Sequence, residues 1–392
     1  MEAVDDSAAP TAVPPVVAVV VTANAGPWLE EAIAALAAQD YPNLSVLVID
    51  AASEVDPTPR IAAVLPSAYV RRLDANPGYA GAANDVIGVV EGASHYVFLH
   101  DDAAPDPDAI RLMVEEAFRS NAGIVAPKLV EWDDPMQLLA VGASADKAGV
   151  VRPYGRHELD QEQHDAVRDV FVAPGGCTLV RADLFESLGG FDAGIELFGE
   201  DLDLSWRAQV VGARVVVAPG ARVRHREAGV RGERELEIGT TTGELPERVA
   251  RLQLRHRLRA VLKNYSPVHL LRVLPQLIAL TTGEAVMALF SGQRRLAGAL
   301  TDAWRWNFRH RRELRVARRD AQRSRALRDR EVRRLQAGGS VRLSAALRGG
   351  FEAEERTFGV GAAGRQLAGA VASGGARLTV TVWLGVCLLL MF

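Results

Sequence analysis

In the first third of the chain, the apolar residues form short continuous runs, each followed by a polar or glycine-rich stretch. VVAVVVTAN (16–24), LSVLVID (44–50) and HYVFLHDD (95–102) are almost wholly apolar until they end in Asn or Asp. Short apolar runs bounded in this way are typical of strands buried on both faces of a sheet. The pattern therefore predicts three buried strands, with AYVRRLD (68–74) and AGIVAPKLV (122–130) as two more.

Between these runs, the apolar residues recur at helical spacing. PWLEEAIAALAAQ (27–39) has this period and begins with a proline, which the first turn of a helix tolerates well. A glycine-rich stretch leads into a second helix around 81–92, and 106–119 has the pattern of a third. Alternating strands and helices with short connections predict an α/β fold: a mostly parallel sheet with helices on both faces.

Residues 153–169 are polar and irregular, and we expect them to form a flexible loop near the ligand-binding site of the domain. From 170 to 226 the order returns as a strand, a helix and a glycine turn, then a helix that opens at 199–203 and a strand that ends near 225. No internal repeat is apparent.

The pattern changes after residue 228. ELPERVARLQLRHRLRAVLKNY (244–265) is a basic amphipathic helix, and 294–334 is dense in arginine. Residues 267–290 are apolar enough for a membrane or interfacial helix, although His269, Arg272 and Glu284 interrupt them, and a buried packing helix is the alternative.

The last 15 residues, 378–392, are apolar and fall short of the roughly 20 that span a bilayer. We interpret them as the start of a transmembrane helix in a fragment of a longer protein. The chain then divides into a disordered N-terminus (1–14), an α/β domain (15–230), a basic connecting helix (231–266), a membrane or interfacial helix (267–290), an arginine-rich cytoplasmic segment (291–377) and the start of a truncated membrane helix (378–392).

The charges are unevenly distributed along the chain. Residues 1–230 carry 16 Lys and Arg against 35 Asp and Glu, whereas the remainder carries 29 against 14, so the two parts have different partners. A basic segment beside apolar helices fits the cytoplasmic face of a membrane, where anionic lipids attract it. A solvated helix face and a nucleic-acid surface are the alternatives. Because no RNP, zinc or helix-turn-helix motif is present, we expect no nucleic acid.

Cys177 and Cys387 lie far apart and form no metal-binding pair, which indicates a reducing compartment without a disulfide framework.

Polar side chains follow the predicted strands at their carboxyl ends. Asn24, Asp50, Asp101 and Asp102 occupy these positions, and ligands of α/β sheets bind at this edge. Carboxylates suit Mg²⁺ or Mn²⁺, which in turn neutralise a diphosphate. The alternative for Asp50 and for the Asp101–Asp102 pair is a helix or turn cap.

Three further groups could carry chemistry. The segment DANPGYAGAAND (74–85) contains glycines that let a backbone approach a phosphate, although an ordinary turn before a helix would look the same. Glu200, Asp201 and Asp203 open a helix, where acids are favoured in any case, but they could also supply a general base. His225 ends a strand among arginines and is either structural or a metal ligand.

Taken together, these pieces resemble a known family. Asn24, Asp50, NPGYAGAAN, the acids at 101–102, PGGCTLVRADLFESLGGFD, GEDLDLSWRA and VRH occur in the order and spacing of family 2 glycosyltransferases of the GT-A fold. The bacterial rhamnosyl- and galactofuranosyl-transferase-like members are the most similar. The resemblance covers roughly residues 16–226.

The resemblance implies a role for each matching position. Asp201 would be the catalytic base that deprotonates the acceptor hydroxyl. Asp102 and His225 would bind Mg²⁺ or Mn²⁺. The donor, a nucleotide-diphosphate sugar, would lie against Asn24, Asp50, Asn76, Gly78, Gly81, Asn84 and Asp101. The acceptor, a lipid-linked or glycan molecule of cell-wall or surface-polysaccharide assembly, would lie against Gly176, Cys177, Glu200 and Trp206. The transfer would be inverting, at the cytoplasmic face of the cell membrane.

The sequence also departs from the family pattern. His100 stands where the family has the first acid of its Asp-x-Asp element, and Val86 replaces a glycine. The Gln-x-x-Arg-Trp element of processive synthases is absent, which favours transfer of one or a few sugars. A transferase-like membrane scaffold that has lost activity is an alternative because of His100. A nucleotidyltransferase is a second one, although no lysine-bearing glycine loop follows the first strand.

Overall fold

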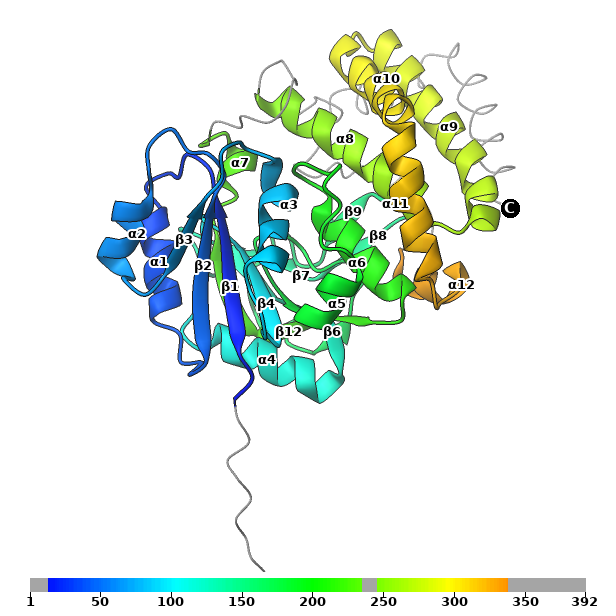
Figure 1. Ribbon diagram of the computed structural model, residues 1–392. Helices are drawn as coiled ribbons and strands as arrows, with labels where there is room; N and C mark the ends of the chain where they lie inside the picture. The colour runs from blue at the N-terminus through cyan, green and yellow to red at the C-terminus, as the bar shows by residue number, and fades with distance from the viewer. Residues whose placement is uncertain (1–12, 235–244, 338–392) are drawn as a thin grey trace, which may run out of the picture.

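The computed structural model describes residues 13–234 and 245–337 (Figure 1). Within these residues the chain builds one 10-stranded sheet and one two-stranded sheet. The large sheet contains β1 (Val16–Thr22), β2 (Leu44–Asp50), β3 (Tyr69–Arg72), β4 (His95–His100), β5 (Ala103–Pro105), β6 (Ala122–Glu131), β7 (Leu138–Val141), β10 (Arg168–Asp169), β11 (Cys177–Arg181) and β12 (Arg214–His225). The small one pairs β8 (Ala143–Ala145) with β9 (Val151–Pro153).

The large sheet is mixed rather than parallel throughout. Its main order is β10-β12-β6-β11-β4-β1-β2-β3, with β3, β2, β1 and β4 mutually parallel. β6 and β12 are also parallel to each other, but β11 lies antiparallel between β4 and β6. The register pairs Thr22 with Asp50 and Val21 with His100, so β1, β2 and β4 end at one edge.

Helices cover both faces of this sheet, as the sequence predicts (Figure 1). Alternate residues of each strand face opposite sides, so Val16, Ala18 and Val20 pack with one set of helices and Val17, Val19 and Val21 with the other. The first set is α1 (Leu29–Ala37), α2 (Thr58–Val64) and α4 (Ala109–Ser120). The second is α3 (Gly78–Ala83), α5 (Ala182–Ser187) and α6 (Glu200–Val210).

A third layer of helices packs on the outer side of α6. It contains α8 (Leu245–Asn264), α9 (Pro267–Phe290), α10 (Arg294–Arg309), α11 (Arg311–Arg323) and α12 (Asp329–Val332). A separate apolar cluster joins Leu202 and Trp206 of α6 to Leu258 of α8, Leu277 of α9 and Leu300 of α10. Helix α6 is therefore held between the sheet and the C-terminal helices. The short α7 (Ala228–Arg231) follows β12.

Several element ends differ from the sequence prediction. The strand predicted at 16–24 ends at Thr22, because Asn24 takes a left-handed φ of 49° that no strand residue has. The helix predicted near 81–92 begins at Gly78 and continues as a 3₁₀-helix (Asn84–Gly88). Helix α2 was not predicted, and its only buried residue is Ile61, which gives no apolar stripe to recognise. A second 3₁₀-helix (Arg333–Leu335) closes the described chain.

The irregular loop predicted at 153–169 is anchored at its centre. Lys128 of β6 is buried and pairs with Asp160 at 2.9 Å and with Asp165 at 2.5 Å. Residues 1–12 of the predicted disordered N-terminus and the predicted membrane segment 378–392 lie outside the described residues.

Candidate active site

The two acids that follow β4, Asp101 and Asp102, are buried, and each accepts a hydrogen bond. Asp101 is 0% exposed, accepts a hydrogen bond from the Thr22 hydroxyl at 2.6 Å and pairs with Arg234. Asp102 accepts a hydrogen bond from the backbone N–H of Ala228 at 2.8 Å, and its second oxygen faces His225. The two neighbouring carboxylates thus point to different partners, which relieves their repulsion.

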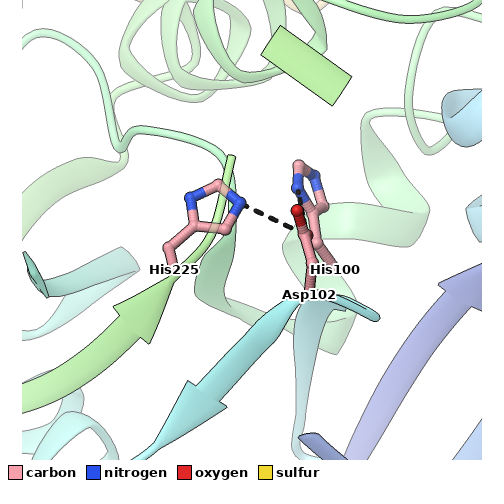
Figure 2. A group of neighbouring side chains, drawn as sticks. All are labelled: His100, Asp102 and His225. Atoms are coloured by element: carbon pink, nitrogen blue, oxygen red, sulfur yellow. Dashed lines mark ion pairs between the residues drawn. The ribbon is translucent and has the colours of Figure 1, made fainter. Parts of the chain in front are cut away.

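His100, Asp102 and His225 form a compact cluster. One ligand atom from each lies within 4.8 Å of the others, and Figure 2 shows the two imidazoles on either side of the carboxylate. Asp102 Oδ1 is 3.4 Å from His225 Nε2 and 3.9 Å from His100 Nδ1. Nε2 of each histidine is buried without a hydrogen-bond partner among the described residues. Two imidazoles and a carboxylate are a donor set that fits a divalent metal ion.

The charges within this cluster are set by burial and by the ion pair. Burial, followed by the nearby His225, lowers the pKa of His100 to about 4, so its imidazole is neutral. Burial alone would raise the pKa of Asp102, but His225, together with His100 and Arg234, outweighs it and holds that pKa well below the usual range. For His225, burial alone would lower the pKa. The Asp102 carboxylate outweighs this effect, so the pKa of His225 is raised.

The turn Gly175–Gly176 contacts both this cluster and a second pair of acids. Gly176 has a φ of 109°, and a Cβ there would lie 2.8 Å from Nδ1 of His225, so only glycine fits. Its carbonyl accepts a hydrogen bond from the His100 N–H at 2.9 Å. The Gly175 N–H donates to Asp201 at 3.3 Å.

Glu200 and Asp201 are that second pair, at the start of α6. Burial raises the pKa of Asp201, while burial together with the Asp201 charge raises the pKa of Glu200 to about 8. Glu200 is 6% exposed and its Oε2 has no hydrogen-bond partner among the described side chains. Both acids line one pocket with Tyr79, Phe98 and His100. Carboxylates with raised pKa values in a pocket are typical of acid–base chemistry.

Two residues assigned to the acceptor side, Trp206 and Cys177, are wholly buried in the structure, and their contact with an acceptor stays a prediction. Trp206 is 0% exposed and packs edge-to-face against Phe171 and Tyr265. Five residues along a helix turn the side chain about 140° away from Asp201, toward α8. Cys177 is also fully buried, facing the first apolar core, and burial raises its thiol pKa to about 12.

On the donor side, Asn24 and Asp50 connect neighbouring loops at the edge of the sheet. Asp50 is fully buried, accepts hydrogen bonds from Ser53 and pairs with Arg72 at 2.7 Å. Asn24 Oδ1 accepts a hydrogen bond from the Glu54 N–H at 2.9 Å. These contacts organise the crevice at the ends of β1 and β2.

The glycine-rich segment is tied to the loop before α6. Asn84 donates to the Phe191 carbonyl at 2.9 Å and accepts from its N–H at 2.7 Å. Asn76 accepts a hydrogen bond from Gly78 at 2.9 Å, and a Cβ on Gly78 would lie 2.4 Å from the Glu196 carbonyl oxygen. A Cβ on Gly81 would lie 2.8 Å from Pro77. Contact of these residues with a nucleotide stays a prediction.

Arg234 and Trp28 are site residues that the sequence did not suggest. The Arg234 guanidinium pairs with Asp101 and lies 5.5 Å from the centre of the Trp28 ring. The two residues are more than 200 positions apart, and no motif links them.

A model of the family "Glycosyltransferase like family 2" matches residues 14–237. The chain belongs to this family. The N-acetylglucosaminyl-diphospho-decaprenol L-rhamnosyltransferase of Mycobacterium tuberculosis (H37Rv) is 31% identical over 244 residues, which are 56% of this chain and 77% of the relative. The O-antigen biosynthesis protein RfbC of Myxococcus xanthus is 28% identical over 147 residues, 34% of this chain and 11% of RfbC.

Among solved structures, the mannosyltransferase PcManGT from Pyrobaculum calidifontis, in complex with GDP-Man and Mn²⁺, aligns with a TM-score of 0.46 and 19% identity. The alignment covers 97% of this chain and 87% of that one. The family match confirms the GT-A α/β fold expected from the sequence, and it favours glycosyl transfer over nucleotidyl transfer.

Proposed function

We propose that this glycosyltransferase is an inverting enzyme that moves a sugar from a nucleotide-diphosphate donor to a lipid-linked acceptor in cell-wall or surface-polysaccharide assembly. The observation that carries the proposal is the arrangement around Gly175–Gly176. This turn contacts both groups: Gly176 lies against His100 and His225, and Gly175 bonds Asp201. An inverting transfer needs a group that holds the leaving diphosphate and, apart from it, a base for the acceptor.

Each side chain has a defined task in this proposal. Asp201 removes the proton from the acceptor hydroxyl, which attacks the anomeric carbon in line with the departing nucleotide. Asp102 and His225 hold the divalent ion, Mg²⁺ or Mn²⁺. When bound, this ion supplies positive charge that stabilises the leaving diphosphate. Asn24, Asp50 and the segment Asn76–Asn84 orient the nucleotide in the crevice at the ends of β1 and β2.

The proposed acceptor follows from the relative in Mycobacterium tuberculosis, whose name describes transfer of rhamnose to a decaprenyl-linked sugar. The test is a transfer assay that screens UDP-, GDP- and dTDP-sugars against an N-acetylglucosaminyl-diphospho-polyprenol, with EDTA and then excess Mn²⁺. We expect transfer from one donor, its loss in EDTA and its recovery with Mn²⁺. Transfer that is unchanged in EDTA would contradict the role of the ion. Failure of every donor to bind would favour the inactive scaffold.

The second part of the proposal places the enzyme at the cytoplasmic face of the membrane. Helix α9 has 24 residues and a mean hydropathy of 1.5 in its most apolar window, of which 22% is buried, so by length and composition it could cross a membrane. Its exposed apolar residues include Leu271 and Phe290. The next helices carry exposed arginines such as Arg312 and Arg319, which anionic lipids attract.

We expect the protein to pellet with phosphatidylglycerol vesicles and much less with phosphatidylcholine vesicles. The double variant Leu271→Asp/Phe290→Asp should reduce pelleting, because it places charge in the apolar surface of α9. Val55→Asp, at an exposed apolar residue of the catalytic domain, is the matched control and should pellet like the wild type. Equal pelleting of the double variant and the wild type would exclude α9 as the contact.

A further inference from the structure

His100 belongs to the same cluster as Asp102 and His225, but the proposed function assigns the ion only to those two residues. His100 ends β4, its ring packs edge-to-face on Tyr79 with centroids 4.7 Å apart, and its backbone N–H is bonded to Gly176. We propose that His100 is a third protein ligand of the metal ion, giving a site of two imidazoles and one carboxylate that prefers Mn²⁺ to Mg²⁺. This inference rests on the proposed function, in which Asp102 and His225 already hold the ion.

The distances within the cluster support this assignment. Ligands bound at about 2.1 Å and at right angles lie about 3 Å from one another. Asp102 Oδ1 is 3.4 Å from His225 Nε2 and 3.9 Å from His100 Nδ1, so both imidazole nitrogens lie within about 1 Å of this spacing. Small rotations of the rings are sufficient to close the site around an ion.

The surroundings of the ring also suit a ligand. A metal-bound imidazole commonly donates its second N–H to a carboxylate or carbonyl, which fixes its orientation. His100 Nε2 and Glu200 Oε1 lie 3.8 and 4.0 Å from the position that a Cβ on Gly175 would take, so both face the same small space. Nε2 of His100 and the other oxygen of Glu200 are buried and lack hydrogen-bond partners among the described residues. In this proposal Glu200 accepts the Nε2–H of His100 when Nδ1 binds the ion.

A histidine in place of an acid at position 100 changes which metal ion the site prefers. Mg²⁺ favours oxygen ligands and binds imidazole poorly, whereas Mn²⁺ and the later first-row metals accept nitrogen. With His100 in place of a carboxylate, the site carries one negative charge fewer. The ion consequently keeps more of its positive charge for the diphosphate. His100 thus adapts the site to a different metal and need not inactivate it.

The test is a Mn²⁺ titration followed by electron paramagnetic resonance, with spin-echo modulation to count the coordinated imidazole nitrogens. We expect two nitrogens in the wild type. We expect one nitrogen in His100→Ala, with Mn²⁺ affinity lower by about tenfold or more. His100→Asp should also show one nitrogen and should shift the ratio of Mn²⁺ to Mg²⁺ affinity toward Mg²⁺. The control is His157→Ala, at an exposed histidine outside the cluster, and it should match the wild type.

The possible outcomes separate the two proposals. Wild-type protein that binds no Mn²⁺ would overturn the metal role itself. Binding with a single nitrogen in the wild type, unchanged in His100→Ala, would overturn only the assignment of His100. Circular dichroism of each variant identifies loss of folding, and His100→Asp keeps a polar ligand at the position if His100→Ala is unstable.

Discussion

Asp201→Asn is expected to lower the rate of sugar transfer by about 10²- to 10⁴-fold, the usual contribution of a positioned general base. The amide has nearly the shape of the carboxylate, and its single oxygen can keep the hydrogen bond from the Leu202 N–H at 2.7 Å while the longer one from Gly175, at 3.3 Å, is lost. The start of α6 should therefore keep its structure. Affinity for the nucleotide donor, measured by calorimetry with Mn²⁺, should change little, because the base acts on the acceptor.

The matched control for this variant is Asp183→Asn. Asp183 is an exposed acid in the first turn of α5 and pairs only with Arg181 among the described residues. It should leave the transfer rate within a factor of about two. Undiminished turnover in Asp201→Asn would remove this residue as the base.

The pH dependence gives the same prediction a second readout. Since burial raises the pKa of Asp201, part of it is protonated at a pH where an ordinary aspartate is fully ionised. Transfer should then increase with pH along a limb that lies above the usual range of carboxyl groups. Glu200, whose pKa is raised to about 8 by burial and by the Asp201 charge, is protonated while Asp201 ionises, so Glu200→Gln should leave this limb in place. A limb that moves to lower pH in Glu200→Gln would indicate that Glu200 is already ionised when Asp201 titrates.

The central strands could be predicted from the sequence because a strand that is buried on both faces consists of a continuous run of apolar residues. The strand predicted at 44–50 has those bounds in the structure, and β1 differs only at its end. The placement of β11 could not be predicted. Its sequence identifies a strand, but nothing in it specifies an antiparallel position between β4 and β6. Strand neighbours depend on contacts between distant parts of the chain.

In the candidate site, too, some features could be predicted from the sequence and others could not. Asp102 and His225, 123 positions apart, were assigned by their resemblance to a family motif, and the structure brings them to 3.4 Å. Trp206 was assigned to the acceptor side because its motif is continuous in sequence with Glu200, but the burial of its side chain against the core could not be predicted from that motif. Arg234 was missed because an arginine in a basic turn resembles many others until its partner, Asp101, is located.

A buried network of charges joins α6 to α8 and keeps the acids of the site in place. Asp203, which is 0% exposed, accepts hydrogen bonds from Lys263 at 2.7 Å, Arg207 at 2.8 Å and Asn264 at 2.9 Å. Lys263, 2% exposed, also bonds Asp192 at 2.6 Å in the loop that leads to α6. Removal of one partner from such a network leaves a buried charge without full compensation.

Lys263→Met is therefore expected to destabilise the protein by about 3–5 kcal/mol, since the methionine fills the space of the lysine but leaves two buried carboxylates short of one positive charge. The melting temperature followed by circular dichroism should fall by on the order of 10 °C. Arg323→Met, at a residue whose side chain is 71% exposed, is the control and should melt within about 0.5 kcal/mol of the wild type. Asp203→Asn combined with Lys263→Met should recover part of the loss, because the pair is then removed together. A single variant that melts like the wild type would show that Arg259 and Arg207 are enough to compensate both acids.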